Sequence, residues 1–211
     1  MKLHKIAVLG GGGRTGKYLV NQLINKGFQL KVLLRHPEQF QIESQQIEIV
    51  QGDATHPESI LQLAEGCDAI ISVVGQRPGE PMVACRVTQN LLNAMKHFGI
   101  PRLISLAGLN VDIPTDRKGK ETMMATKWMK ANFPEIHADR QESHALLEQS
   151  QLDWTLVRVP FIEFQEARGE LTVNLEDCPS GKINAGSLAI FLVDQLQDER
   201  FIRKAPFAAT F

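Results

Sequence analysis

The residues Ile6-Ala7-Val8-Leu9-Gly10-Gly11-Gly12-Gly13-Arg14-Thr15-Gly16 set the architecture of this chain. The first four form a short apolar run with the length of a buried strand, and consecutive glycines stop that run. The segment 17–26 that follows spaces its apolar residues at helical intervals, and Gly27 is suited to end a helix. The order strand, glycine-rich loop, helix is the setting in which a loop binds phosphate groups.

The glycines indicate that this loop binds a dinucleotide. Glycine permits a tight turn and lets the backbone approach a pyrophosphate closely, while the following helix N-terminus attracts the phosphates. Gly11, Gly13 and Gly16 satisfy the pattern G-x-G-x-x-G. With Gly10 in place of Gly11, the same loop satisfies G-x-x-G-x-x-G, so the register stays open. The predicted cofactor-binding loop consists of Gly10, Gly11, Gly12, Gly13, Arg14, Thr15 and Gly16.

The end of the second predicted strand indicates which dinucleotide binds. An acidic residue there would bond the ribose hydroxyls of NAD(H), whereas an arginine accommodates the 2′-phosphate of NADP(H). This strand ends in Leu34-Arg35-His36, without an acidic residue. Arg35 offers a planar set of donors to a phosphate, and Arg14 could close over the same group. We expect NADP(H) as the preferred cofactor and NAD(H) as the alternative; two solvated arginines are the competing interpretation.

Apolar runs and helical segments alternate along the rest of the chain. Such a pattern is typical of a parallel sheet covered on both faces, so we expect an α/β fold with a doubly wound parallel sheet of the Rossmann type. We expect a single domain over residues 1–211, in which about 160–185 form a small cap on the substrate side. The expected strands cover 6–9, 30–34, 47–50, 69–74, 102–106 and 154–159, with a small extra strand at 171–173 and an edge strand at 201–207. The expected helices cover 17–26, 57–64, 81–98, 119–150 with an interruption at Pro134, and 187–196.

The composition is that of an ordinary globular protein. Of the 211 residues, 43% are hydrophobic and 22% are charged, which suffices for a well-buried core. The formal net charge is −1 and basic residues are spread along the chain, so we expect no nucleic-acid partner and no membrane binding. No apolar run approaches the roughly 18 residues of a membrane span. We expect a cytoplasmic protein without a leader, and a monomer, because no long apolar seam is left over.

The cysteines and histidines predict no metal site. Cys67, Cys85 and Cys178 form no C-x-x-C pair, so we expect reduced thiols. His137 and His144 lie two helical turns apart, which is wide for a shared metal ion that would also need a third ligand. We expect both histidines at the surface, with a proton-handling role as the alternative.

Further segments resemble a known family. They are Gly13-Arg14-Thr15-Gly16, Leu34-Arg35-His36-Pro37, Gln51-Gly52-Asp53-Ala54, Asp68-Ala69-Ile70-Ile71-Ser72, Asn90-Leu91-Leu92-Asn93-Ala94-Met95, Arg102-Leu103-Ile104-Ser105 and Leu152-Asp153-Trp154-Thr155-Leu156-Val157-Arg158-Val159-Pro160. Over nearly its whole length the chain resembles the atypical short-chain dehydrogenases/reductases with NmrA-like members. Within this group it is most similar to the NADPH-dependent flavin reductase/biliverdin reductase B branch, which implies a Rossmann-type reductase.

The resemblance implies roles for residues beyond the glycine loop. Asp53 and Ala54 would lie beside the adenine, with Asp53 accepting a hydrogen bond from its amino group. Ser105, at the end of the fifth strand, would face the nicotinamide and is the one candidate catalytic residue. The remaining implied contacts, to the ribose and pyrophosphate or beside the nicotinamide, are Val74, Gly75, Gln76, Pro160 and Phe161. As alternatives, Asp53 could cap the next turn and Phe161 could belong to the core.

The dyad Tyr-x-x-x-Lys, which such enzymes use for proton transfer, is absent. The single tyrosine, Tyr18, lies in the first helix and is followed four residues later by Gln22. The aligned stretch offers His137, Asp139 and Arg140 instead. Reduction of a flavin tolerates this loss, because hydride passes directly to the ring and the proton equilibrates with water. We therefore expect a small-molecule acceptor, flavin or a similar planar molecule; a non-catalytic NmrA-like NADP(H) sensor and an epimerase- or dehydratase-like enzyme are the alternatives.

Overall fold

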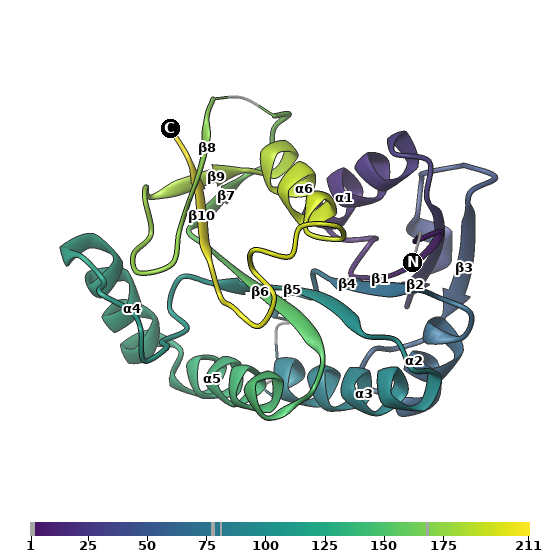
Figure 1. The fold of residues 1–211 in the computed structure, drawn as a ribbon, viewed down its shortest axis with the longest axis horizontal. Helices are drawn as coiled ribbons and strands as arrows, with labels where there is room; N and C mark the ends of the chain where they lie inside the picture. Colours follow the sequence, from purple (N-terminus) through teal and green to yellow (C-terminus); the bar gives the residue numbers. More distant parts are fainter. Residues whose placement is uncertain (1–2, 77–78, 81, 168) are drawn as a thin grey trace.

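The computed structural model describes residues 3–76, 79–80, 82–167 and 169–211. Its centre is an eight-stranded sheet with the order β3-β2-β1-β4-β5-β6-β10-β8 (Figure 1). The strands are β1 (Lys5–Leu9), β2 (Gln29–Leu34), β3 (Ile47–Gln51), β4 (Ala69–Ser72), β5 (Arg102–Gly108), β6 (Asp153–Val159), β8 (Leu171–Asn174) and β10 (Phe207–Thr210). All neighbouring strands pair in parallel except β8, which runs antiparallel to β10. The predicted doubly wound α/β fold is confirmed.

Helices cover both faces of this sheet. They are α1 (Arg14–Asn25), α2 (Pro57–Ala64), α3 (Val83–Phe98), α4 (Lys120–Asn132), α5 (Pro134–Gln149) and α6 (Ala185–Asp194), with a 3₁₀ turn at Pro37–Gln39. Figure 1 shows α1 and α6 on one face, α2, α3 and α5 on the other, and α4 projecting at the side. Side chains of β1 alternate accordingly, with Ile6 and Val8 in the core under α1 and α6, and Ala7 and Leu9 in the core under α2 and α3.

The order of the strands locates the binding edge. The chain winds outward through β1, β2 and β3 and then returns to place β4 on the other side of β1. Ligands of open α/β sheets bind at such a reversal, outside the carboxyl ends of the strands. In this protein that position lies between the ends of β1 and β4, directly beside the glycine loop.

Some predicted element boundaries need correction. The edge strand expected at 201–207 is wrong, because residues 201–203 form turns, Lys204 makes only an isolated bridge with Thr155, and the strand begins at Phe207. This strand, β10, is fully buried between β6 and β8, so β8 is the edge. The helix expected at 81–98 starts at Val83 in the described residues, and Pro81 lies outside them. The interruption predicted at Pro134 is confirmed, since Pro134 is the first residue of α5.

The segment expected to form a cap contributes to two sheets. Strand β7 (Phe161–Glu163) pairs in parallel with β9 (Lys182–Asn184) in a separate two-stranded sheet, whereas β8 joins the main one.

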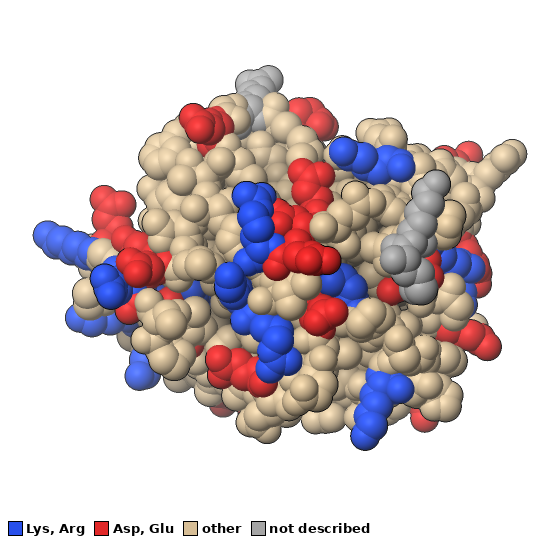
Figure 2. Space-filling view, viewed as in Figure 1, with Lys and Arg blue, Asp and Glu red and all other residues tan. Residues whose placement is uncertain are grey.

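Basic and acidic side chains lie next to one another on the face shown in Figure 2. Within the described residues, no helix combines the length and the apolarity that crossing a membrane requires.

Candidate dinucleotide-binding site

The glycine loop passes close to β4 and to the first turn of α1. Gly10 has a φ of +79°, and a Cβ there would lie 2.9 Å from the backbone carbonyl of Val73. A Cβ on Gly16, in the first turn of α1, would overlap the carbonyl oxygen of Gly10. Gly11 is buried against β2, where its Cβ would lie 2.6 Å from Cγ1 of Val32. These positions therefore need glycine to bring the loop, the helix and the strands together.

The start of α1 has the features of a phosphate site. Gly13 is its N-cap, without a side-chain cap, and the first turn contains no acidic residue. The N–H group of Gly13 donates to the carbonyl oxygen of Gly10 at 3.0 Å. The N–H groups of the first turn of α1 and the positive end of the helix dipole face outward, beside the exposed Gly12. An anionic diphosphate fits this position, because it would accept hydrogen bonds from those N–H groups.

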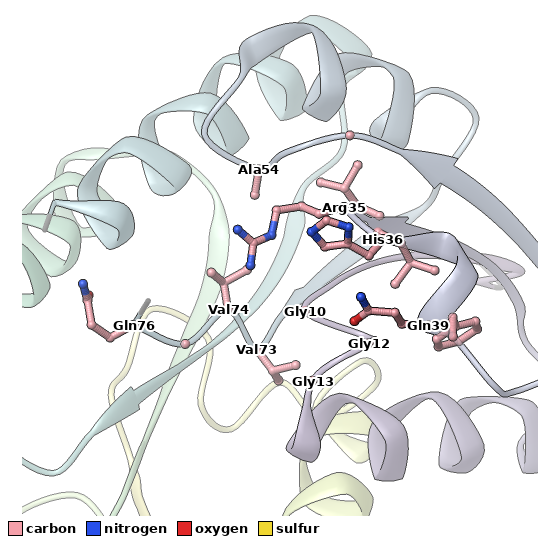
Figure 3. A pocket seen from close by; sticks show the side chains of 15 residues that line it. Gly10, Gly12, Gly13, Arg35, His36, Gln39, Ala54, Val73, Val74 and Gln76 are labelled. Carbon is pink, nitrogen blue, oxygen red and sulfur yellow. The ribbon is translucent and has the colours of Figure 1, made fainter. Parts of the chain in front are cut away.

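A cavity of about 340 Å³ opens in front of the loop (Figure 3). Its size is within the range of small-molecule and cofactor sites. Its walls come from the glycine loop and from the residues that follow β2, β3 and β4. Eight of the predicted cofactor-binding residues line this cofactor cavity: Gly10, Gly12, Gly13, Arg35, Ala54, Val74, Gly75 and Gln76. The other lining residues were not predicted, namely Leu33, Leu34, His36, Gln39, Phe40, Gly52 and Val73.

The end of β2 gathers nitrogen donors at this cavity. Figure 3 shows the guanidinium of Arg35 reaching toward Val74, with His36 and Gln39 nearby. Nη1 of Arg35 lies 4.0 Å from Oε1 of Glu80, and both side chains are nearly half exposed, at 44% and 48%. An exposed ion pair of this length contributes little to stability. No described residue that lines the cavity is acidic. The signal for Gln39 was Pro37, which starts the 3₁₀ turn that brings Gln39 to the cavity.

The other predicted residues of the loop and of the adenine side lie around this cavity rather than in its wall. Oδ1 of Asp53 accepts hydrogen bonds from the backbone N–H and the hydroxyl of Thr55, at 2.8 and 2.7 Å. This is the turn-capping geometry that was the alternative for Asp53. Arg14 holds its guanidinium carbon 4.2 Å above the ring centre of Phe164, so it faces the cap segment. Thr15 follows Arg14 in the first turn of α1 and does not line the cavity.

Pro160 and Phe161 follow β6, and neither lines the cofactor cavity. Pro160 is buried, whereas Phe161 begins β7 and is 74% exposed. The contact of both residues with the nicotinamide stays a prediction.

Ser105 lines a second, smaller cavity of about 20 Å³, which adjoins the first at Val74. Ser105 pairs with Ser72 across β5 and β4, and both residues line this space. From the helical side, Arg140 on α5 lines it as well and donates a hydrogen bond from Nη2 to the carbonyl oxygen of Val74 at 3.2 Å. We call this space the Ser105 cavity.

Asp139 and His137, which lie in the stretch aligned with the missing dyad, both contact other residues of the protein. The carboxylate of Asp139 is buried and accepts hydrogen bonds from the N–H groups of Ala84 and Cys85, both at 2.8 Å, so it caps α3. Nδ1 of His137 lies 3.3 Å from the amide nitrogen of Asn110.

The prediction of surface histidines is wrong. His137 is 7% exposed and His144 is 4% exposed, because the face of α5 that carries them packs against the rest of the protein. His144 makes an edge-to-face contact with Trp154, with ring centres 5.7 Å apart. Burial lowers the pKa of both histidines.

The three cysteines are free thiols, as expected. Burial raises the pKa of Cys67 and of Cys178 to about 11, which makes both thiols poor nucleophiles at neutral pH. Among the described residues, no three His, Cys, Asp or Glu side chains gather into a group that could hold a metal ion.

Solved structures share this fold over nearly their whole length. The oxidoreductase YlbE of Lactococcus lactis aligns with a TM-score of 0.82 at 23% identity, over 98% of this chain and 91% of that chain. A short-chain dehydrogenase/reductase of Veillonella parvula, solved in complex with NADP, gives 0.80 at 14% identity over 99% and 95%. ChuY, an anaerobillin reductase of Escherichia coli O157:H7, gives 0.81 at 16% identity over 98% and 97%. At these identities the likeness shows the fold alone.

Comparison of sequences identifies relatives and a family. The Photosystem II assembly factor Ycf39 of Cyanophora paradoxa is 24% identical over 201 residues, which cover 93% of this chain. This chain spans only 57% of the length of that relative. The family described as NAD(P)H-binding matches residues 10–199, from the glycine loop to the turn beyond α6. Since that match includes the cofactor cavity and most of the chain, the protein belongs to the NAD(P)H-binding family.

Proposed function

We propose that this protein is an NADPH-dependent reductase that passes a hydride to flavin or to a similar planar, conjugated acceptor. One observation carries the proposal. Among the described residues, the lining of the cofactor cavity and of the Ser105 cavity includes no carboxylate, tyrosine or lysine. The missing carboxylate favours NADP(H) over NAD(H), and the missing tyrosine and lysine favour an acceptor that needs no positioned acid.

The preference for NADPH rests on the donors at the end of β2. Arg35, His36 and Gln39 line the part of the cavity where the ribose that carries the 2′-phosphate would lie. A phosphate accepts charge-assisted, two-pronged hydrogen bonds from a guanidinium. The exposed contact with Glu80, at 4.0 Å, is too weak to hold Arg35 away from a doubly charged phosphate.

The part of the chain itself would be to orient the reactants. The bound reduced nicotinamide would supply the hydride. The N–H groups of Gly12 and of the first turn of α1 would hold the pyrophosphate, and Val74 and Gly75 would lie along the cofactor toward Ser105. Fixing the donor and the acceptor in contact removes much of the entropic barrier to hydride transfer.

The nature of the acceptor follows from the missing acid. Reduction of a ketone places negative charge on one oxygen, which must receive a proton during the reaction. A flavin spreads this charge over its ring system and takes its proton from water afterwards, so the described residues suffice for it. ChuY, an anaerobillin reductase with the same fold, supports this class of reaction on this scaffold.

The test is a stopped-flow or steady-state assay of NADPH oxidation with FMN as acceptor. The same assay is run with NADH in place of NADPH and with a control that lacks acceptor. We expect turnover that depends on FMN, saturates in both reactants and is faster with NADPH. If NADPH binds in the same sample and FMN produces no turnover, the proposal is wrong, and a protein that senses NADP(H) without catalysis becomes the better description.

A further inference from the structure

Arg140, which lines the Ser105 cavity, is a cation without an ion-pair partner among the residues that the structure describes. Arg140 lies half-buried on α5, and within the described part of the chain no carboxylate comes within ion-pair distance of it. The neighbouring Asp139 carboxylate is occupied by the amides of Ala84 and Cys85. In these same residues the only hydrogen bond of the Arg140 guanidinium is the one to the carbonyl oxygen of Val74. A guanidinium has five N–H donors, so most of them stay available to a ligand.

A second donor lines the same space. The hydroxyl groups of Thr88 and Ser143, which also line it, form a hydrogen bond with one another at 2.8 Å. Ser105 also lines the cavity, and its hydroxyl has no hydrogen bond to any other residue that the structure describes. The cavity volume of about 20 Å³ admits one water-sized atom. The space therefore suits a single oxygen atom that accepts hydrogen bonds from Arg140 and Ser105.

We propose that Arg140 and Ser105 form a subsite for one carbonyl oxygen of the acceptor, at which negative charge develops during the reaction. This inference rests on the proposed reductase function and narrows its substrate class. The acceptor would be a planar, conjugated molecule with a ring carbonyl, such as the isoalloxazine of a flavin, which becomes an anion when it takes up hydride. The cavity is too small for a ring, so the ring itself would lie outside it, next to Val74 and the cofactor cavity.

The charges that develop during hydride transfer suit an arginine at this position. The hydride leaves the nicotinamide with its electron pair and forms a new bond to the acceptor ring, while a second electron pair of that ring moves toward the carbonyl oxygen. The oxygen becomes negatively charged, and the nicotinamide becomes positively charged. Arg140 keeps its proton and stabilises the oxygen by charge and hydrogen bonding, and a proton from water neutralises the product later.

Arg140 thus has a different task from the tyrosine of the familiar dyad. A tyrosine hydroxyl can give up its proton to an alkoxide, whereas a guanidinium stays protonated in a protein. Burial lowers the pKa of Arg140, and the charge of Asp139 opposes this effect. An arginine guanidinium is a cation in proteins at neutral pH. Such a site favours acceptors that are stable as anions, and it discriminates against simple ketones.

The experiment compares wild type, Arg140→Gln and Arg140→Lys in the complex with NADP⁺. Binding of oxidised FMN and of anaerobically reduced FMN is measured by fluorescence or calorimetry, together with steady-state kinetics and NADPH affinity. For Arg140→Gln we expect kcat to fall about 100-fold, as for loss of one donor to a developing oxyanion. We also expect the affinity for reduced FMN to fall at least about 10-fold, with less than about threefold change for oxidised FMN and for NADPH. Arg140→Lys should recover part of both losses, because it keeps the charge.

A merely structural role for Arg140 predicts different results. Equal loss of affinity for both forms of FMN and for NADPH, or kcat within about threefold of wild type, would overturn the inference while wild-type turnover upholds the reductase function. If Arg140→Gln does not fold, Ser105→Ala tests the same subsite with a smaller change, and it should lower the preference for reduced FMN. Wild-type protein that binds neither form of FMN would overturn the inference, and absence of turnover with every acceptor would overturn the reductase function.

Discussion

Replacing Arg35 by alanine should separate the affinities for NADPH and NADH. In the free protein Arg35 gives up only an exposed contact of 4.0 Å to Glu80, which is worth no more than about 1 kcal/mol. In the complex it would lose a charge-assisted bond to the 2′-phosphate, worth about 1.5–3 kcal/mol. Because the side chain is 44% exposed, the lower part of this range applies, and NADPH should bind roughly 10- to 30-fold more weakly. The affinity for NADH should change less than about twofold, since NADH lacks that phosphate.

Titration of the enhanced nicotinamide fluorescence measures both dissociation constants at fixed ionic strength. Lys96→Ala is a matched control, because it also removes one exposed positive charge but lies at the far end of α3. Glu80→Gln should tighten NADPH binding about two- to threefold by removing a negative charge near the phosphate. Equal weakening of NADPH and NADH in Arg35→Ala, or no change in either, would show that Arg35 does not bind the 2′-phosphate.

Three further predictions concern stability. Gly10→Ala should abolish NADPH binding and lower the free energy of unfolding by about 2 kcal/mol, because φ is +79° and the new Cβ meets the backbone of Val73. Gly27→Ala is the control, because φ is +82° there but the space around it is open. In thermal unfolding this control should lose only about 1 kcal/mol, and it should bind NADPH normally. Asp139→Ala should lower the free energy of unfolding in urea by about 2 kcal/mol, because the N–H groups of Ala84 and Cys85 lose their acceptor, and a loss below about 0.5 kcal/mol would contradict the capping role. Because burial lowers the folded-state pKa of His144, its contribution is complete above the unfolded value near 6.5 and falls as pH drops through 6.5. Stability measured in urea should therefore fall between pH 7.5 and 5.5, and His144→Gln should flatten this slope; an unchanged slope would exclude His144 as its source.

Local sequence was a good guide wherever local physics controls the backbone. The run from Ile6 to Gly16 predicted a strand, a phosphate-binding turn and a helix, because apolar spacing and glycine act within a few residues. Pro134 divided two helices as expected, since proline cannot continue a helix from the preceding turn. The position of Arg35 directly after β2 was likewise predictable, because the length of the strand places this residue beside the glycine loop.

Features that join distant parts of the chain were not readable in this way. Strand β10 lies inside the sheet because residues 171–174 return to pair with it, and no local pattern near Phe207 encodes that partner. His144 is buried because α5 packs against Trp154 and α3, although α5 has only a weakly apolar face in its sequence.

The candidate site likewise has one part that local sequence predicted and one part that only tertiary packing decided. Glycine spacing and Arg35 predicted a dinucleotide site, because the residues expected to bind the phosphates follow one another along a single strand–turn–helix–strand unit. The meeting of Ser105 and Arg140 around one small cavity depends on how α5 packs against the ends of β4 and β5. Packing of side chains between elements far apart in the chain controls that distance, and this packing, unlike helix or turn formation, has no signature within a short stretch of sequence.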